Sequence, residues 1–170
     1  MNNNFWEQFS TPIMALAPMA GVTDAAFRHV CSNMGADVVY SEMANVTALR
    51  YQPQKTLEML QSFSDQSPYV IQLFGSRPEE FGQAVKFLMQ EEEIRARGVD
   101  NYCAPRGVDI NFGCPVPKVA KAGAGAELFK DPELSYEVIQ AVTENSSVPV
   151  SIKTRTYAYG NDILSFLERI

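Results

Sequence analysis

The sequence predicts an α/β protein, a (β/α)8 TIM barrel truncated to about five βα units. Short apolar runs typical of strands alternate with amphipathic stretches typical of helices, which indicates parallel strands joined by crossover helices. A doubly wound sheet shows the same alternation, but the strand starts recur about every 34 residues, so that eight units would take about 270 residues, near the roughly 250 of a complete barrel. The chain has 170 residues, which is room for five such units.

The composition is that of a soluble globular protein, with 46% hydrophobic and 20% charged residues and a net charge of −6. No apolar stretch reaches the roughly 18 residues that a membrane span needs. The start of the chain lacks the basic and apolar regions of a secretory signal, so we expect a cytoplasmic protein. The acidic balance disfavours nucleic-acid binding by this chain alone, because phosphate contacts need a local excess of Lys and Arg.

Five strands are expected, each ending near glycine, proline or polar residues. In chain order they cover residues 13–17, 38–42, 69–74, 108–111 and 148–154. The helix after the first strand is expected to start at Thr23 and to stop at Gly35. Its apolar residues recur at helical spacing and are expected to face the core: Phe27, Val30, Cys31 and Met34.

Three further helices have recognisable starts. Ser76 and Glu79 form the pattern of a capping box before one of them, and Asp131 followed by Pro132 is typical of a helix start. The residues expected on the buried faces of these two helices are Phe81, Val85 and Leu88, and Leu134, Val138, Ala141 and Val142. A last helix over residues 161–170 is expected to begin with Asn161 as its cap.

Polar side chains stand at the carboxyl ends of the expected strands. Side chains alternate along a strand, so those that oppose the apolar set are expected to point inward: Glu42, Gln72, Asp109, Asn111, Ser151 and Lys153. The carboxyl rim is where barrels build their active sites. A single polar residue of this kind is typical of a solvated strand end, but four successive strands favour a site for a polar ligand that is anionic or rich in carbonyl groups.

The strongest single motif is Asn111-x-Gly113-Cys114-Pro115, directly after a strand. Gly113 permits a sharp turn and Pro115 prevents regular structure, so Cys114 is expected at the rim. A thiol with a pKa of about 8.5 is mostly protonated at neutral pH, which suits a proton donor, whereas a nucleophile needs a neighbouring base. The one histidine, His29, belongs to the first helix, so an acid is preferred; the alternative is an inert buried thiol.

Two other segments have chemical interest. Residues 16–21 are small and poor in donors, a surface on which a flat ring can lie, with Met19 as a soft contact. Residues 118–126 contain Lys118, Lys121 and two glycines, and are expected to be either a flexible loop that closes over an anion or a solvated linker. The three cysteines are too far apart for a metal or redox pair, so no metal site is expected.

Four segments together resemble one family. They are Ala-Pro-Met-Ala-Gly-Val-Thr-Asp at 17–24, Gln-Leu-Phe-Gly at 72–75, Asp-Ile-Asn-Phe-Gly-Cys-Pro at 109–115 with Lys118, and Ser-Ile-Lys-Thr-Arg at 151–155. In order and spacing they are similar to the tRNA-dihydrouridine synthases. The resemblance implies an oxidoreductase that holds FMN in a (β/α)8 barrel and uses NADPH to reduce the C5=C6 bond of particular uridines in tRNA.

The resemblance also implies roles for individual residues. It assigns cofactor contacts to Pro18, Met19, Ala20, Gln72 and Lys153. In this scheme the first three form a backbone shelf beside the isoalloxazine, Gln72 binds its pyrimidine edge, and Lys153 lies near N1 and the C2 carbonyl. Cys114 protonates C5 of the uracil while hydride passes from the flavin N5 to C6, and Asn111 contacts the base.

The resemblance further implies that residues 1–170 are the N-terminal portion of a single FMN-binding barrel domain. The rest of the barrel and a helical tRNA-binding domain are then expected to lie outside this chain. Two alternatives remain open from the sequence. One is another FMN barrel, such as a relative of dihydroorotate dehydrogenase that acts on a free pyrimidine. The other is a non-catalytic fragment that does not bind flavin.

Overall fold

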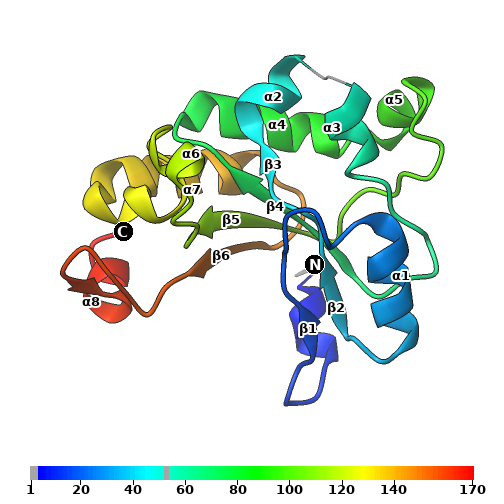
Figure 1. Ribbon diagram of the computed structural model, residues 1–170, viewed down its shortest axis with the longest axis horizontal. Coiled ribbons are helices and arrows are strands. Elements are labelled where there is room, and N and C mark those ends of the chain that lie inside the picture. The colour runs from blue at the N-terminus through cyan, green and yellow to red at the C-terminus, as the bar shows by residue number, and fades with distance from the viewer. Residues whose placement is uncertain (1–3, 52–53) are drawn as a thin grey trace.

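A parallel sheet that curls into a half-barrel is the centre of the structure, which is a computed structural model and describes residues 4–51 and 54–170 (Figure 1). Its strands are β1 (Ala15–Leu16), β2 (Val38–Tyr40), β4 (Tyr69–Phe74), β5 (Gly107–Phe112) and β6 (Val150–Thr154), in that spatial order. Every neighbouring pair in this order is parallel. The predicted fold class, a TIM barrel truncated to about five units, is confirmed.

Helices surround the sheet, and most of them lie in the connections between its strands (Figure 1). They are η1 (Phe5–Gln8), α1 (Ala25–Asn33), α2 (Val46–Tyr51), α3 (Gln54–Glu58), α4 (Pro78–Leu88), α5 (Glu91–Ala96), α6 (Pro117–Ala120), η2 (Gly125–Lys130), α7 (Pro132–Asn145) and α8 (Ile163–Leu167). In the described residues, none of these helices combines the length and apolarity needed to cross a bilayer.

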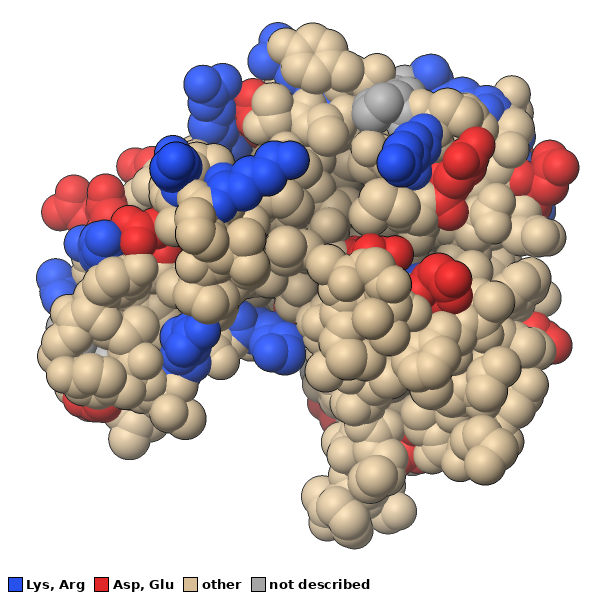
Figure 2. Space-filling view, in the orientation of Figure 1, with Lys and Arg blue, Asp and Glu red and all other residues tan. Residues whose placement is uncertain are grey.

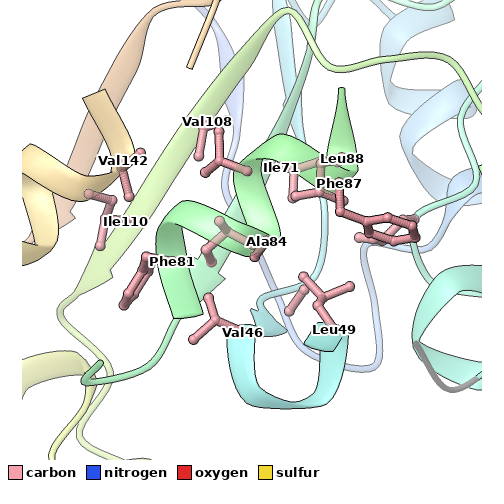
Figure 3. Packing of buried hydrophobic residues seen from close by; sticks show 14 of the residues in the cluster. Val46, Leu49, Ile71, Phe81, Ala84, Phe87, Leu88, Val108, Ile110 and Val142 are labelled. Carbon is pink, nitrogen blue, oxygen red and sulfur yellow. The ribbon is translucent and has the colours of Figure 1, made fainter. Parts of the chain in front are cut away.

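The hydrophobic core lies between the sheet and helices α2, α4 and α7. Figure 3 shows Phe81 and Ala84 of α4 between the strand residues Ile71 and Ile110 and the α2 residue Val46. The faces predicted for α4 and α7 are confirmed, since Val85, Leu88, Val138 and Val142 are fully buried and Leu134 packs against the same cluster. Strands β4 and β5 are buried on both sides, as parallel strands under crossover helices are.

The amino ends of the strands are closed by η1. Its Phe5 is 4% exposed and packs with Val38 and Val70 in a small separate cluster. Gly107 makes this approach possible, because a Cβ at that position would lie 3.0 Å from the Phe5 ring. The carboxyl ends of the strands therefore remain the open side of the half-barrel.

The prediction for α1 was wrong about its buried face. Phe27, Val30 and Met34 are 40%, 56% and 83% exposed, and Cys31 is only partly buried. The buried side chain of this helix is Arg28, which donates to the Thr23 and Gln61 carbonyls and lies over the Tyr69 ring. Apolar residues that recur at helical spacing are typical of a helix face that packs against other residues. No described residue covers this face of α1.

Two predicted helix starts were also wrong. The cap of α1 is Asp24, which accepts from the Phe27 amide, and not Thr23. Ser76 does not cap α4, because its hydroxyl donates to the carbonyl of Ala122. The cap predicted for α7 is confirmed, since Asp131 accepts from the Leu134 amide.

The remaining differences concern short elements. The cap of α8 is Asp162, and the helix covers Ile163–Leu167, less than the predicted 161–170. Strand β3 (Ala44–Asn45), which pairs with β4, and the hairpin of β7 (Tyr157–Ala158) and β8 (Asn161–Asp162) were not predicted. The segment 118–126, for which the sequence left a flexible loop or a solvated linker open, contains residues of α6 and η2, and its Val119, Ala124 and Ala126 are buried.

Candidate active site

Polar side chains of β4, β5 and β6 meet at the carboxyl rim. The strand register places Gln72 beside Asp109, Asp109 beside Ser151, and Asn111 beside Lys153. Gln72, Asp109 and Asn111 are buried, whereas Lys153 is exposed. The period-2 pattern of the sequence predicted this gathering, because residues of equal parity on parallel neighbours share one face of the sheet.

A chain of hydrogen bonds joins these side chains across the three strands. Ser151 Oγ donates to one Asp109 oxygen at 2.7 Å, and Gln72 Nε2 donates to the other at 2.7 Å. Asn111 Nδ2 in turn donates to Gln72 Oε1 at 3.0 Å. Since an ionised carboxylate only accepts, Asp109 fixes the amide of Gln72 with its oxygen toward Asn111.

Burial raises the pKa of Asp109 from 3.8 to about 6, against the lowering effect of its bonds to Gln72 and Ser151 and of the Lys153 charge. Tyr40, which lies near this carboxylate, has its pKa raised to about 12, mainly by burial and also by the negative charge of Asp109. The polar network therefore lies in a poorly solvated interior.

Cys114 is held in place by backbone contacts on two sides. Asn111 Oδ1 accepts from the amides of Gly113 and Cys114, at 3.1 and 2.9 Å, which fixes the turn after β5. The Cys114 carbonyl accepts from the Ala126 amide at 3.1 Å. Gly125 allows this approach, because its φ is +66° and a Cβ there would lie 2.7 Å from the Cys114 oxygen.

Cys114 lines a cavity of about 350 Å³ at the rim. The sequence-predicted site residues that the structure brings to this cavity are Pro18, Ala20, Gln72, Asn111, Cys114 and Lys153. Met19 is not among its lining residues; it is 39% exposed, and its amide donates to Thr23 Oγ1. Glu42 accepts from the Gly21 amide and so holds the loop after β1 from outside this cavity.

Sequence reasoning assigned no role to Met43, Thr154 and Arg155, which also line the cavity. Arg155 Nε donates to the Gly113 carbonyl at 2.8 Å, beside the cysteine. Arg155 lies two residues after Lys153, and this period-2 spacing could have predicted its place at the cavity. Met43 lies in an irregular connection, where no strand or helix periodicity applies. Figure 2 shows Lys and Arg side chains on the wall of the deep hollow on the open side.

No base lies beside Cys114 among the residues that the structure describes. His29 is on α1, where it contacts Asn33 and lies 5.2 Å from the Phe63 ring. The described part of the chain also contains no group of three His, Cys, Asp or Glu side chains that could hold a metal ion. The site therefore brings a thiol together with oriented amides and cations.

Comparison with known proteins identifies the family to which this chain belongs. The dihydrouridine synthase (Dus) family matches residues 15–168. A probable tRNA-dihydrouridine synthase of Staphylococcus aureus (strain COL) is 35% identical over 165 residues, which are 95% of this chain and 46% of the relative. Probable tRNA-dihydrouridine synthase 2 of Bacillus subtilis (strain 168) is 37% identical over 158 residues, which are 91% of this chain and 45% of the relative.

tRNA-dihydrouridine synthase B of Xanthomonas axonopodis pv. citri (strain 306) is 34% identical over 145 residues, which are 85% of this chain and 40% of the relative. The chain thus spans somewhat less than half the length of these relatives. The matched range contains the whole rim and every residue that lines the cavity. The chain belongs to the dihydrouridine synthase family.

Proposed function

We propose that this chain forms part of an FMN- and NADPH-dependent tRNA-dihydrouridine synthase, the N-terminal portion of its barrel domain, which reduces the C5=C6 bond of particular uridines in tRNA. The observation that carries the proposal is the hydrogen-bonded chain from Asp109 through Gln72 and Asn111 to the Cys114 amide. It presents a thiol, two oriented amides and a cation to one cavity at the barrel rim.

The donors around the cavity fit FMN. Pro18 and Ala20 form a small, flat wall on which the isoalloxazine would lie, with Met19 following the same backbone. Gln72 Nε2 carries two hydrogens, of which the Asp109 carboxylate binds one, so the amide is already oriented to bind a ring edge. Lys153 would lie where negative charge collects on the reduced ring.

When bound, FMN supplies the hydride for C6 of the uracil, with NADPH as the source of electrons. The other atom added to the C5=C6 bond is a proton, and in our proposal it comes from the Cys114 thiol to C5. Among the described residues no base lies beside Cys114, which favours an acid over a nucleophile at this position.

Asn111 would contact the target base. Its Oδ1 is occupied by the two turn amides, and one Nδ2 hydrogen binds Gln72. The Nδ2 group also approaches Met43 Sδ, at 3.5 Å, and a thioether is a weak acceptor that a uracil carbonyl can replace. The uridine must leave its stack to reach this position, at a cost of a few kcal/mol.

The proposal is tested by Cys114→Ala in the FMN-loaded protein, with tRNA and NADPH supplied. We expect flavin absorbance to be retained and dihydrouridine formation to fall by about 100-fold or more, the usual contribution of a general acid. Cys103→Ala, a partly buried thiol outside this cavity, is the matched control and should keep its activity. Undiminished turnover in Cys114→Ala would refute the acid role.

A second variant tests the cofactor site. Lys153→Ala should lower flavin occupancy, measured as the ratio of absorbance near 450 nm to that near 280 nm, or slow flavin reduction by NADPH, because the cation beside the reduced ring is lost. Lys86→Ala changes an exposed lysine on α4 and is the control. Wild-type occupancy and reduction rate in Lys153→Ala would remove this residue from the site.

A further inference from the structure

A second, larger cavity adjoins the catalytic one at the rim. It measures about 700 Å³ and lies between α2 and the turn of α6. Ala20, Met43 and Val116 line both cavities, so they form a shared wall. Met43 also contacts the catalytic amide, since Asn111 Nδ2 approaches its sulfur at 3.5 Å. A ligand in one cavity is therefore separated from a ligand in the other by the wall that these three residues form.

The walls of the second cavity offer ring surface more than polar recognition. Tyr51 and Phe74 are aromatic, and Met43 and Met59 add soft apolar contacts. Several polar lining atoms are already engaged, because Glu42 accepts from the Gly21 amide, Asn45 Oδ1 accepts from the Ala48 amide and Thr47 Oγ1 donates to Glu80. A planar group can stack here while few hydrogen bonds specify which group it is.

Positive charge lies beside this cavity. Lys118 lines it, and Lys121 follows at the end of α6. Both lysines are exposed, and neither has a carboxylate partner among the residues that the structure describes. Figure 2 shows Lys and Arg side chains over α6, on the face that also contains the hollow. Stacking surface next to unpaired cations is the combination that binds single-stranded nucleic acid.

We propose that the second cavity receives the base of a nucleotide next to the target uridine, stacked against Tyr51 and Phe74, with Lys118 on the backbone phosphate. The inference rests on the proposed function. A uridine that leaves its stack also deprives its neighbour of a stacking partner, and the aromatic wall replaces that partner. Since the wall offers few free polar atoms, the cavity accepts different bases at this position and increases affinity more than sequence selectivity.

The experiment measures binding of a labelled RNA hairpin with one loop uridine to the full chain by fluorescence anisotropy. Three further hairpins have an abasic ribose in place of the uridine, of its 5′ neighbour, or of its 3′ neighbour. We expect one abasic neighbour to weaken binding about 5-fold or more, because stacking on an aromatic side chain has that effect. Exchanging that neighbour among the four bases should change affinity less than removing it.

Variants test whether the difference in affinity between the intact and abasic-neighbour hairpins arises in the second cavity. Tyr51 is 75% exposed, so Tyr51→Ala does not put folding at risk, and it should abolish the difference between the intact and abasic-neighbour hairpins. Tyr136→Ala changes an exposed tyrosine on α7 outside both cavities and should preserve the difference. Ala122→Trp fills the cavity from its other side and should act like Tyr51→Ala. Lys118→Ala should weaken binding of intact and abasic-neighbour hairpins by the same factor.

Equal affinity for the intact hairpin and both abasic-neighbour hairpins would overturn the inference, as would a difference that persists in both Tyr51→Ala and Ala122→Trp. Competition between NADPH and the intact hairpin that Tyr51→Ala abolishes would assign the cavity to the reductant instead, and would also overturn it. The proposed function fails separately, if the abasic uridine binds as well as the uridine does and Cys114→Ala has full turnover.

Discussion

Asp109 is a fully buried carboxylate whose two oxygens accept from Gln72 and Ser151, at 2.7 Å each. It touches neither Asn111 nor Cys114 directly, but the orientation of both follows from the way it holds Gln72. A buried charge of this kind lowers stability unless its partners compensate for lost solvation. The raised pKa, about 6, shows that compensation at Asp109 is incomplete.

The first prediction concerns the pH dependence of stability. Because folding raises the pKa of Asp109 from 3.8 to about 6, the folded chain binds this proton more tightly than the unfolded chain does. The contribution to the free energy of unfolding is therefore complete below about pH 4 and is lost as pH rises through 6, on the order of 3 kcal/mol in total. Asp109→Asn has no such titration.

Urea denaturation at pH 4 and pH 7 measures this. The measured quantity is the free energy of unfolding of Asp109→Asn minus that of the wild type. This difference should be larger at pH 7 than at pH 4, by on the order of 2 to 3 kcal/mol. Asp100→Asn changes an exposed carboxylate and is the control. The same pH dependence in the wild type and Asp109→Asn would show that Asp109 does not titrate in this range.

The sequence predicted which residues meet at the rim but not how they are bonded. Alternation along a strand is local geometry, so the parity of Gln72, Asn111 and Lys153 could be read directly. The bond from Gln72 to Asp109 depends on the register of β4 against β5, which only the folded sheet determines. Met43 joins the site from an irregular connection, for the same tertiary reason.

Among the elements, the helices show where local patterns stop being sufficient. The faces of α4 and α7 were predicted because each packs on the sheet along a stripe at helical spacing. The face of α1 was not, because Arg28 is buried through two carbonyl partners and an aromatic ring that come together only in the folded chain. Strand β3 is only two residues long and exists through its pairing with β4.

The second prediction compares two residues that the sequence treats alike as helix caps. Asp131→Ala should lower the free energy of unfolding by about 1 kcal/mol, because the Leu134 amide loses its acceptor. Ser76→Ala should not change the start of α4, which has no side-chain cap. It should instead remove the hydrogen bond to the Ala122 carbonyl beside Gly123. Hydrogen exchange of both segments distinguishes these results; faster exchange at the start of α4 in Ser76→Ala would contradict the assignment.

The third prediction tests the buried arginine of α1. Arg28→Met keeps the length of the side chain but leaves the Thr23 and Gln61 carbonyls without their donor. We expect a loss of about 2 to 4 kcal/mol in the free energy of unfolding, because one buried and one part-buried carbonyl lose their donor. Arg169→Met, an exposed arginine after α8, should change it by less than about 1 kcal/mol. Equal effects would contradict the role of Arg28.

At the scale of the whole molecule, the main run of the half-barrel ends at β1 on one side and at β6 on the other, and each of these strands is paired along one edge alone (Figure 1). Beside β1 lies the exposed apolar face of α1, with Val30 56% and Met34 83% accessible to solvent. Open strand edges and contiguous apolar surface both favour association with another polypeptide. The described chain therefore has a second surface suited to association, apart from the rim that carries the candidate site.

The fourth prediction follows from this surface. The isolated chain should self-associate as its concentration rises, and Met34→Glu combined with Val30→Glu should reduce the association, because the two charges interrupt the apolar face. Sedimentation velocity over a range of concentrations measures it. Tyr136→Glu adds a charge to an exposed site on α7 and is the control. A wild-type chain that stays monomeric at all concentrations would show that this surface is not adhesive.

The hydrogen-bonded chain from Ser151 to Asn111 crosses three strands at right angles to their course. A slip of one residue between any two of these strands would turn one set of these polar groups to the other face and remove the acceptor that orients the Cys114 turn. The arrangement of the polar groups at the rim consequently depends on the register of the strands. A single inserted residue within β5 would therefore disrupt the polar rim and the core together, because it would also turn Ile110 and Phe112 away from the hydrophobic cluster.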